Sequence, residues 1–174
     1  ITPIAIASIT SAWFSSTMFG GQPLFQIDVV LPDLLPLVPT LLASGLFFGL
    51  IAILFMKLLF ACGKLAVSTG LSTLSLGLVA AVSCGGVAMF VPEVLGLGIG
   101  TVNVILENGY LIGFLLVLLV LKLIVTSLSI GFGLFGGVFS PALFIGAAAG
   151  GFLAKLIALA GFVSAPQLLA VAGM

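Results

Sequence analysis

The sequence contains no histidine and no arginine, and only eight of its 174 residues are charged. Four lysines balance four acidic residues, so the chain lacks the basic surface that binds nucleic acid, and we exclude nucleic acid as a partner. Histidine is the commonest metal ligand and general base, and the two isolated cysteines, Cys62 and Cys84, make neither a metal-ligand cluster nor a disulfide framework. These absences exclude most hydrolytic chemistry, and we expect no metal and no cofactor.

What the chain has in abundance is apolar residues. It is 63% hydrophobic with a mean hydropathy of +1.56, which places it outside the soluble classes. Uncharged stretches cover residues 1–27, 34–56, 65–92 and 123–154. Most of them reach the roughly 20 residues that a helix needs to cross about 30 Å of hydrocarbon, and no alternating pattern indicates a barrel. The sequence predicts an all-α, multi-pass integral membrane protein with about five or six helical segments.

The pattern of apolar stretches, charges and helix-breaking residues also bears on the two ends of the chain and on the loops between helices. The chain starts at Ile1 and stops within an apolar run, so we interpret residues 1–174 as a single partial domain, truncated at both ends. Residues 1–19 lack a basic segment and a cleavage pattern, which favours a helix over a signal peptide. Prolines, glycines and charges predict loops at 20–39, 62–70 and 92–100. The lysines around the 62–70 loop favour its placement in the cytoplasm and the 20–39 loop outside.

The longest uncharged stretch is broken by glycines. Residues 131–137 contain four of them, which do not readily continue a helix. Pro141 suits the first turn of a helix, because its fixed φ fits and its missing N–H is not needed there. A new helix is therefore predicted to begin near Val138, at membrane depth, where irregular backbone is tolerated only if it is buried in protein or lines a wet cavity.

A helix that begins at membrane depth is suited to binding an anion. Its first N–H groups have no partner within the helix and carry the positive end of the helix dipole. Val138 and Phe139 would offer these groups, and Gly136 and Gly137 allow close approach of the backbone. Discontinuous helices of this kind bind substrates in transporters. A tight turn between two ordinary helices explains the glycine cluster equally well at this point.

Other features have structural explanations. Residues 90–106 predict a short or re-entrant helix. The spacings of Gly45 with Gly49 and of Gly146 with Gly150 predict close helix packing in lipid. Two lysines, Lys122 and Lys155, lie within apolar stretches, and each either reaches the membrane interface or has a direct role. Two glutamates, Glu93 and Glu107, lie in loops and are interpreted as solvated.

Residues 131–150 resemble the G-x-F-x-P signature region of the CLC family of voltage-gated chloride channels and chloride/proton antiporters. The matching residues are Gly131-Phe132-Gly133-Leu134-Phe135-Gly136-Gly137-Val138-Phe139-Ser140-Pro141 and Ala142-Leu143-Phe144-Ile145-Gly146-Ala147-Ala148-Ala149-Gly150. Residues 92–98 resemble the loop and short helix that precede this region in the family, and residues 167–174 resemble the start of the helix that follows it. Lys122 falls where the family often has a basic residue.

The resemblance implies a partial CLC-type helical bundle that transports chloride across a bilayer, in the plasma or inner membrane. It also implies a homodimer in the full-length protein. The anion site would comprise Gly136, Gly137, Val138, Phe139, Ser140 and Pro141, with the Val138 and Phe139 amides facing a dehydrated chloride. The family's gating and proton-pathway glutamates and its chloride-coordinating tyrosine fall outside this chain, and Tyr110 does not match that position.

The sequence also bears on two other classes of function, an intramembrane protease and a helical scaffold. An intramembrane serine protease needs a histidine, and the aspartyl type needs two membrane aspartates, whereas Asp28 and Asp33 share one proline-rich loop. We therefore expect no enzyme. A truncated or degenerate helical scaffold that transports nothing stays open, as does the choice between channel and antiporter.

Overall fold

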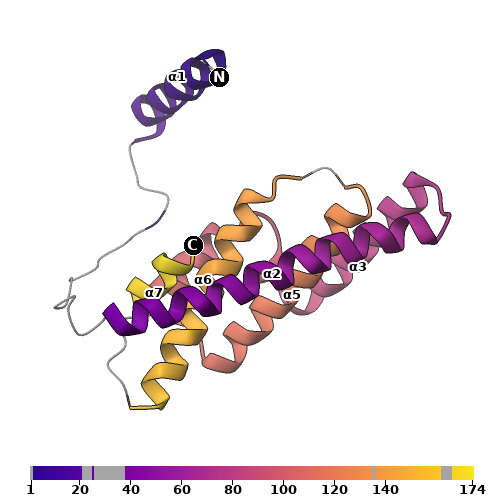
Figure 1. Ribbon diagram of the computed structural model, residues 1–174. Helices are drawn as coiled ribbons and strands as arrows, with labels where there is room; N and C mark the ends of the chain where they lie inside the picture. The colour runs from indigo at the N-terminus through magenta and orange to yellow at the C-terminus, as the bar shows by residue number, and fades with distance from the viewer. Residues whose placement is uncertain (1, 21–24, 26–37, 135, 162–165) are drawn as a thin grey trace.

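The computed structural model describes residues 2–20, 25, 38–134, 136–161 and 166–174 (Figure 1). All regular structure in these residues is helical, which confirms the all-α prediction. The elements are α1 (Thr2–Phe19), α2 (Val38–Ser68), α3 (Thr73–Phe90), the 3-10 helix η2 (Pro92–Val94), α4 (Ile99–Leu106), α5 (Ile112–Gly131), α6 (Phe139–Leu159) and α7 (Pro166–Gly173).

Four of the described helices, α2, α3, α5 and α6, are long and apolar enough to cross a membrane, against the five or six helical segments expected. The 31 residues of α2 make it about 46 Å long at 1.5 Å per residue, more than the hydrocarbon thickness. The helix expected at residues 1–19 is present as α1, and the side chains of residues 3–18 are exposed. With eight residues each, α4 and α7 are too short to span, which confirms the short helix predicted within residues 90–106.

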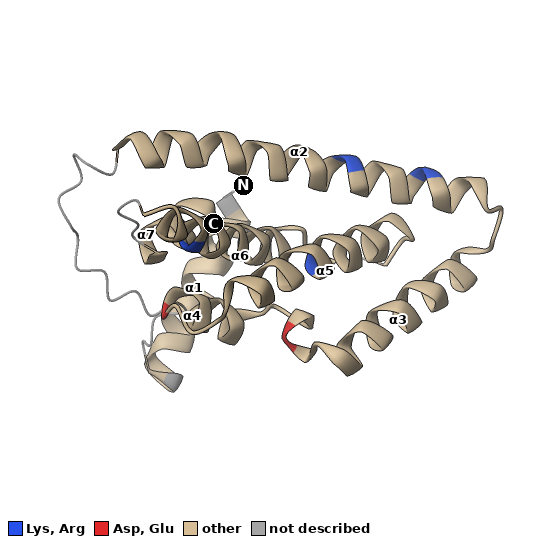
Figure 2. Ribbon diagram, turned by 90° about the horizontal axis from the view of Figure 1, so that it is seen from below, with Lys and Arg blue, Asp and Glu red and all other residues tan. Residues whose placement is uncertain are grey.

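The centre of the bundle is α5. It lies between α2 and α3 (Figure 2) and packs against both of them and against α6. The main core joins α5 and α6 to the short helix α4, and its members include Leu106, Leu115, Leu118, Phe144 and Ile145. Outward faces carry large apolar side chains, such as Leu42 and Leu46 on α2, as expected for helices in lipid.

Small residues let α6 approach α7 closely. A Cβ atom added to Gly146 would overlap the carbonyl oxygen of Gly173, and one added to Gly150 would overlap that of Leu169. This confirms close packing at the Gly146 and Gly150 spacing. The same prediction for Gly45 and Gly49 is wrong for the described residues, because a Cβ atom at either position meets nothing within 4 Å.

The prediction of a loop at residues 62–70 is also wrong. Helix α2 continues to Ser68, and the turn to α3 follows it. The reason lies in packing: Gly131 of α5 lies against Cys62 and the backbone of Gly63, so Gly63 serves close helix contact and does not end the helix. Lys57 and Lys64 thus lie within α2 (Figure 2), and the orientation inferred from that loop loses its basis. The loop predicted at residues 20–39 falls mostly outside the described residues.

Candidate functional site

Helix α5 ends inside the apolar stretch because of a glycine. Gly133 has a φ of +86°, in the left-handed region that favours glycine. Its N–H donates to the carbonyl of Ile130 at 3.0 Å, and the N–H of Leu134 donates to that of Ser129 at 3.0 Å. This pair of bonds is the Schellman motif, which satisfies the last carbonyls of a helix. The backbone is then free to turn before the next helix.

Helix α6 begins as the sequence predicted. Val138 precedes it with a φ of −78°, and its carbonyl accepts the first helical bond from the N–H of Ala142 at 3.0 Å. Pro141 lies in the first turn. Helices α5 and α6 also pack against each other. The chain path between them therefore also fits the alternative interpretation, a tight turn between two ordinary helices. What distinguishes this break from a simple turn is the set of cavities beside it.

The first turn of α6 is held by the loop between η2 and α4. The hydroxyl of Ser140 donates to the carbonyl of Leu97 at 3.0 Å. In the same loop Gly98 has a φ of +70°, and a Cβ atom there would overlap the ring of Phe144, one turn further along α6. The loop and the helix start are therefore fixed against each other by a hydrogen bond and by close packing.

One cavity, of about 210 Å³, lies beside the predicted glycines. Gly136, Gly137 and Pro141 line it together with the Lys122, Thr126 and Ser129 side chains of α5 and Cys84 of α3. Gly136 and Gly137 are exposed. The cavity thus combines backbone, two hydroxyls and an ammonium group, and the described residues that line it include no carboxylate.

A second cavity, of about 190 Å³, lies on the other side of the α6 first turn. Phe139 and Ser140 line it with Leu97 and with Ile99, the first residue of α4. Two helix N-termini therefore meet at one space. Val138 and Phe139, at the start of α6, are 44% and 77% exposed in the described part of the chain. Five of the six predicted residues are thus divided between two cavities at the start of α6, and Val138 lines neither of them.

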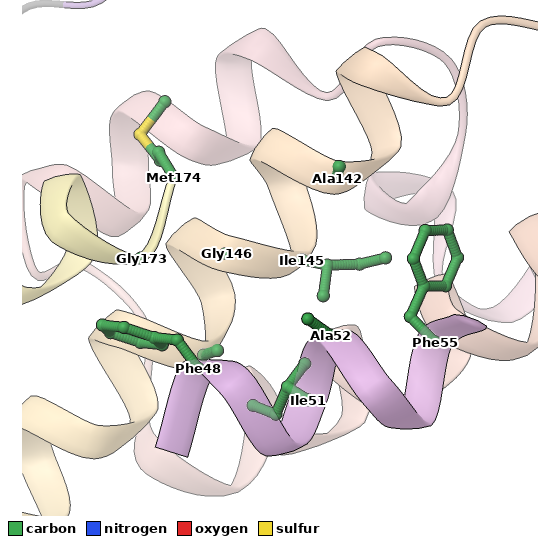
Figure 3. Close-up of a pocket in the computed structure, with 10 residues that line it drawn as sticks. Phe48, Ile51, Ala52, Phe55, Ala142, Ile145, Gly146, Gly173 and Met174 are labelled. Carbon is green, nitrogen blue, oxygen red and sulfur yellow. The ribbon is translucent and has the colours of Figure 1, made fainter. Parts of the chain in front are cut away.

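A third cavity, of about 190 Å³, lies where α2, α6 and α7 meet (Figure 3). The ten described residues that line it carry no polar side chain; they include Phe48 and Phe55 of α2, Ile145 of α6 and Met174. An apolar wall offers nothing to replace the hydration of an ion. We therefore do not assign an ion site here.

The main feature that sequence reasoning missed is the place of Lys122. It was expected either to reach the membrane interface or to have a direct role, but its side chain is only 4% exposed, so the interfacial alternative is wrong. Its Nζ donates to the carbonyls of Val94 at 2.6 Å and Gly96 at 3.0 Å. Lys155 is different: it reaches the carbonyl of the exposed residue Asn108, at 3.5 Å, beyond the end of α4. Glu107 is exposed as expected, and Glu93 is half-buried.

Comparison with known proteins agrees with the resemblance. The family described as voltage gated chloride channel matches residues 1–174. The chain is also 30% identical, over 169 aligned residues, to chloride channel protein CLC-e of Arabidopsis thaliana; the match covers 90% of this chain and 23% of that protein. With a family match over its whole length and four apolar helices, the chain is an integral membrane protein and belongs to the voltage-gated chloride channel family.

Proposed function

We propose that this chain forms part of a chloride pathway in which backbone N–H groups at the start of α6 bind the anion. The observation that carries the proposal is the position of that start: α6 begins within an apolar stretch, between two cavities, with Val138 and Phe139 exposed. The first N–H groups of a helix lack intrahelical acceptors and carry partial positive charge, so they stabilise an anion.

The lining of both cavities supports an anion over a cation. Among the residues that the structure describes, neither lining includes an aspartate or glutamate, whereas Lys122 and two hydroxyl groups contribute to one of them. Binding by neutral dipoles is moderate in strength, and conduction requires an ion that enters readily and also leaves. No covalent step is needed. The relative CLC-e is named a chloride channel, which supports chloride as the transported ion.

Replacing one N–H group tests this proposal. Val138 has a φ of −78°, which proline can adopt, and the preceding residue is a glycine. Val138→Pro therefore removes the amide proton while it preserves the local backbone, and Val138→Ala keeps the proton but shortens the side chain. A hydrogen bond to a charged group contributes about 1.5–3 kcal/mol, so we expect Val138→Pro to weaken chloride affinity at least about tenfold relative to Val138→Ala.

The measurement is chloride flux in liposomes, as a function of chloride concentration, with the protein encoded by the complete reading frame that contains this chain. Equal affinities of Val138→Pro and Val138→Ala would contradict the assigned site. Absence of flux in the unaltered protein would favour the non-transporting scaffold. Proton uptake driven by a chloride gradient in the same vesicles separates coupled exchange from passive flow.

A further inference from the structure

Lys122 is held inside the bundle by three partners. Its Nζ donates to the carbonyl oxygens of Val94 and Gly96, and it lies 4.7 Å from the centre of the Phe144 ring. Carbonyl oxygens and an aromatic face all favour an ammonium ion. Two of the three ammonium protons are donated to carbonyls, and the aromatic face lies beside the group. These contacts hold Lys122 in place, so its charge is the property that we consider for an action on an anion.

That charge has no counterion among the residues that the structure describes. The carboxylates in this part of the chain are Glu93 and Glu107, and neither forms an ion pair with Lys122, whose polar contacts are the two carbonyls. Carbonyl dipoles make the burial of the ammonium tolerable, but they leave its net charge in place. A buried charge without a counterion acts strongly on its surroundings, because little water screens it.

Lys122 also lines the 210 Å³ cavity that reaches Gly136, Gly137 and Pro141 at the start of α6. The positive end of the α6 dipole and the ammonium group thus act on one space. In Figure 2 α5, the helix that carries this buried lysine, lies between α2 and α3. A cavity with low-dielectric walls and charge of one sign concentrates ions of the other sign.

We propose that Lys122 determines ion selectivity by charge, raising the anion concentration in this cavity without binding the anion directly. The inference rests on the proposed anion pathway and adds a residue outside the signature. It predicts that the charge matters most when chloride is scarce, because a filled cavity gains little from further attraction.

The first test substitutes the lysine. Lys122→Gln removes the charge and keeps an N–H donor for the loop carbonyls, whereas Lys122→Arg keeps the charge. In liposomes containing the protein from the complete reading frame, we expect Lys122→Gln to lower flux about tenfold at low chloride, the effect of one charge acting over about 10 Å at an effective dielectric constant near 20. At saturating chloride the loss should be small, and Lys122→Arg should stay near the unaltered protein. Equal flux of Lys122→Gln and unaltered protein at low chloride would overturn the inference.

A second test leaves Lys122 in place, in case its variants fail to fold. Cys84 of α3 lines the same cavity and is partly exposed, so a thiol reagent can add charge there. We expect a sulfonatoethyl methanethiosulfonate to lower flux at low chloride, and an aminoethyl reagent of similar size to preserve or raise it. The Cys84→Ser protein should respond to neither. If both reagents change flux alike, the effect is steric and the charge inference fails.

The two proposals fail in distinguishable ways. If the unaltered protein carries no chloride, the proposed function is wrong. If it carries chloride with the expected loss in Val138→Pro, but responds neither to Lys122→Gln nor to the sign of the reagent at Cys84, only the inference about Lys122 is wrong.

Discussion

The α carbon of Gly146 lies so close to the carbonyl oxygen of Gly173 that no side chain fits between them. Helices α6 and α7 therefore meet backbone to backbone. In lipid, where apolar side chains gain little by leaving the solvent, such contact is a principal source of helix association.

Enlarging Gly146 should therefore destabilise the fold. We expect Gly146→Ala to lower the free energy of unfolding by about 1–3 kcal/mol, because the added methyl group forces α7 away from α6. Gly45→Ala is the matched control: its added methyl meets nothing within 4 Å, and alanine favours a helix over glycine by about 0.5–1 kcal/mol. Thermal unfolding in detergent measures both. A similar loss in the two variants would contradict the packing observed at Gly146.

A second pair of glycines separates backbone strain from overlap. Gly96 and Gly98 have φ values of +60° and +70°, but only Gly98 lies against a side chain, the Phe144 ring. Gly96→Ala should cost about 1 kcal/mol from strain alone, and Gly98→Ala should cost more because the ring must move. Unfolding of the single variants and of Gly98→Ala with Phe144→Leu forms a double-mutant cycle. The cycle should show that the smaller side chain at position 144 relieves part of the free-energy cost of Gly98→Ala. Purely additive effects would exclude an overlap between the added methyl group and the Phe144 ring.

These glycines also show how far the sequence alone could lead. The break between α5 and α6 was predictable, because clustered glycines and Pro141 act locally. The difference between Gly45 and Gly146 was not, since both belong to the same spacing and only Gly146 has a backbone opposite it. The burial of Lys122 depends on carbonyls 26 and 28 residues away, a contact that no local pattern encodes.

Replacing Ser127 on α5 with an apolar residue should stabilise the fold. Its hydroxyl is fully buried and has no hydrogen-bond partner in the described part of the chain, and a buried unpaired polar group costs about 1–3 kcal/mol. Ser127→Ala should therefore raise the free energy of unfolding by about 1 kcal/mol. Ser44 is the control, because it is equally buried but donates to the carbonyl of Leu41 at 2.7 Å, so Ser44→Ala should give no such gain. Equal changes in the two variants would argue against an unpaired Ser127.

Tyr110, between α4 and α5, should ionise above its ordinary pKa of 10.0. Burial raises the pKa of the phenol, the nearby Glu93 carboxylate raises it further, and a hydrogen bond with Thr101 partly opposes them. The folded protein then keeps a proton that the unfolded chain has lost, so above about pH 10 this group lowers stability as pH rises.

The ultraviolet absorbance of the phenolate, taken as the difference between the unaltered protein and Tyr110→Phe, reports this ionisation directly. Glu93→Gln should lower the pH midpoint of the Tyr110 ionisation, because the substitution removes a negative charge that disfavours the phenolate. Thr101→Val should raise this midpoint, because the substitution removes a hydrogen bond that favours the phenolate. The shifts are therefore opposite in sign, which no general change in burial would produce. A midpoint at or below the ordinary value in the unaltered protein would mean that the phenol is solvated. The packing of Tyr110 against Phe114, whose ring centres lie 5.0 Å apart, would then be absent in solution.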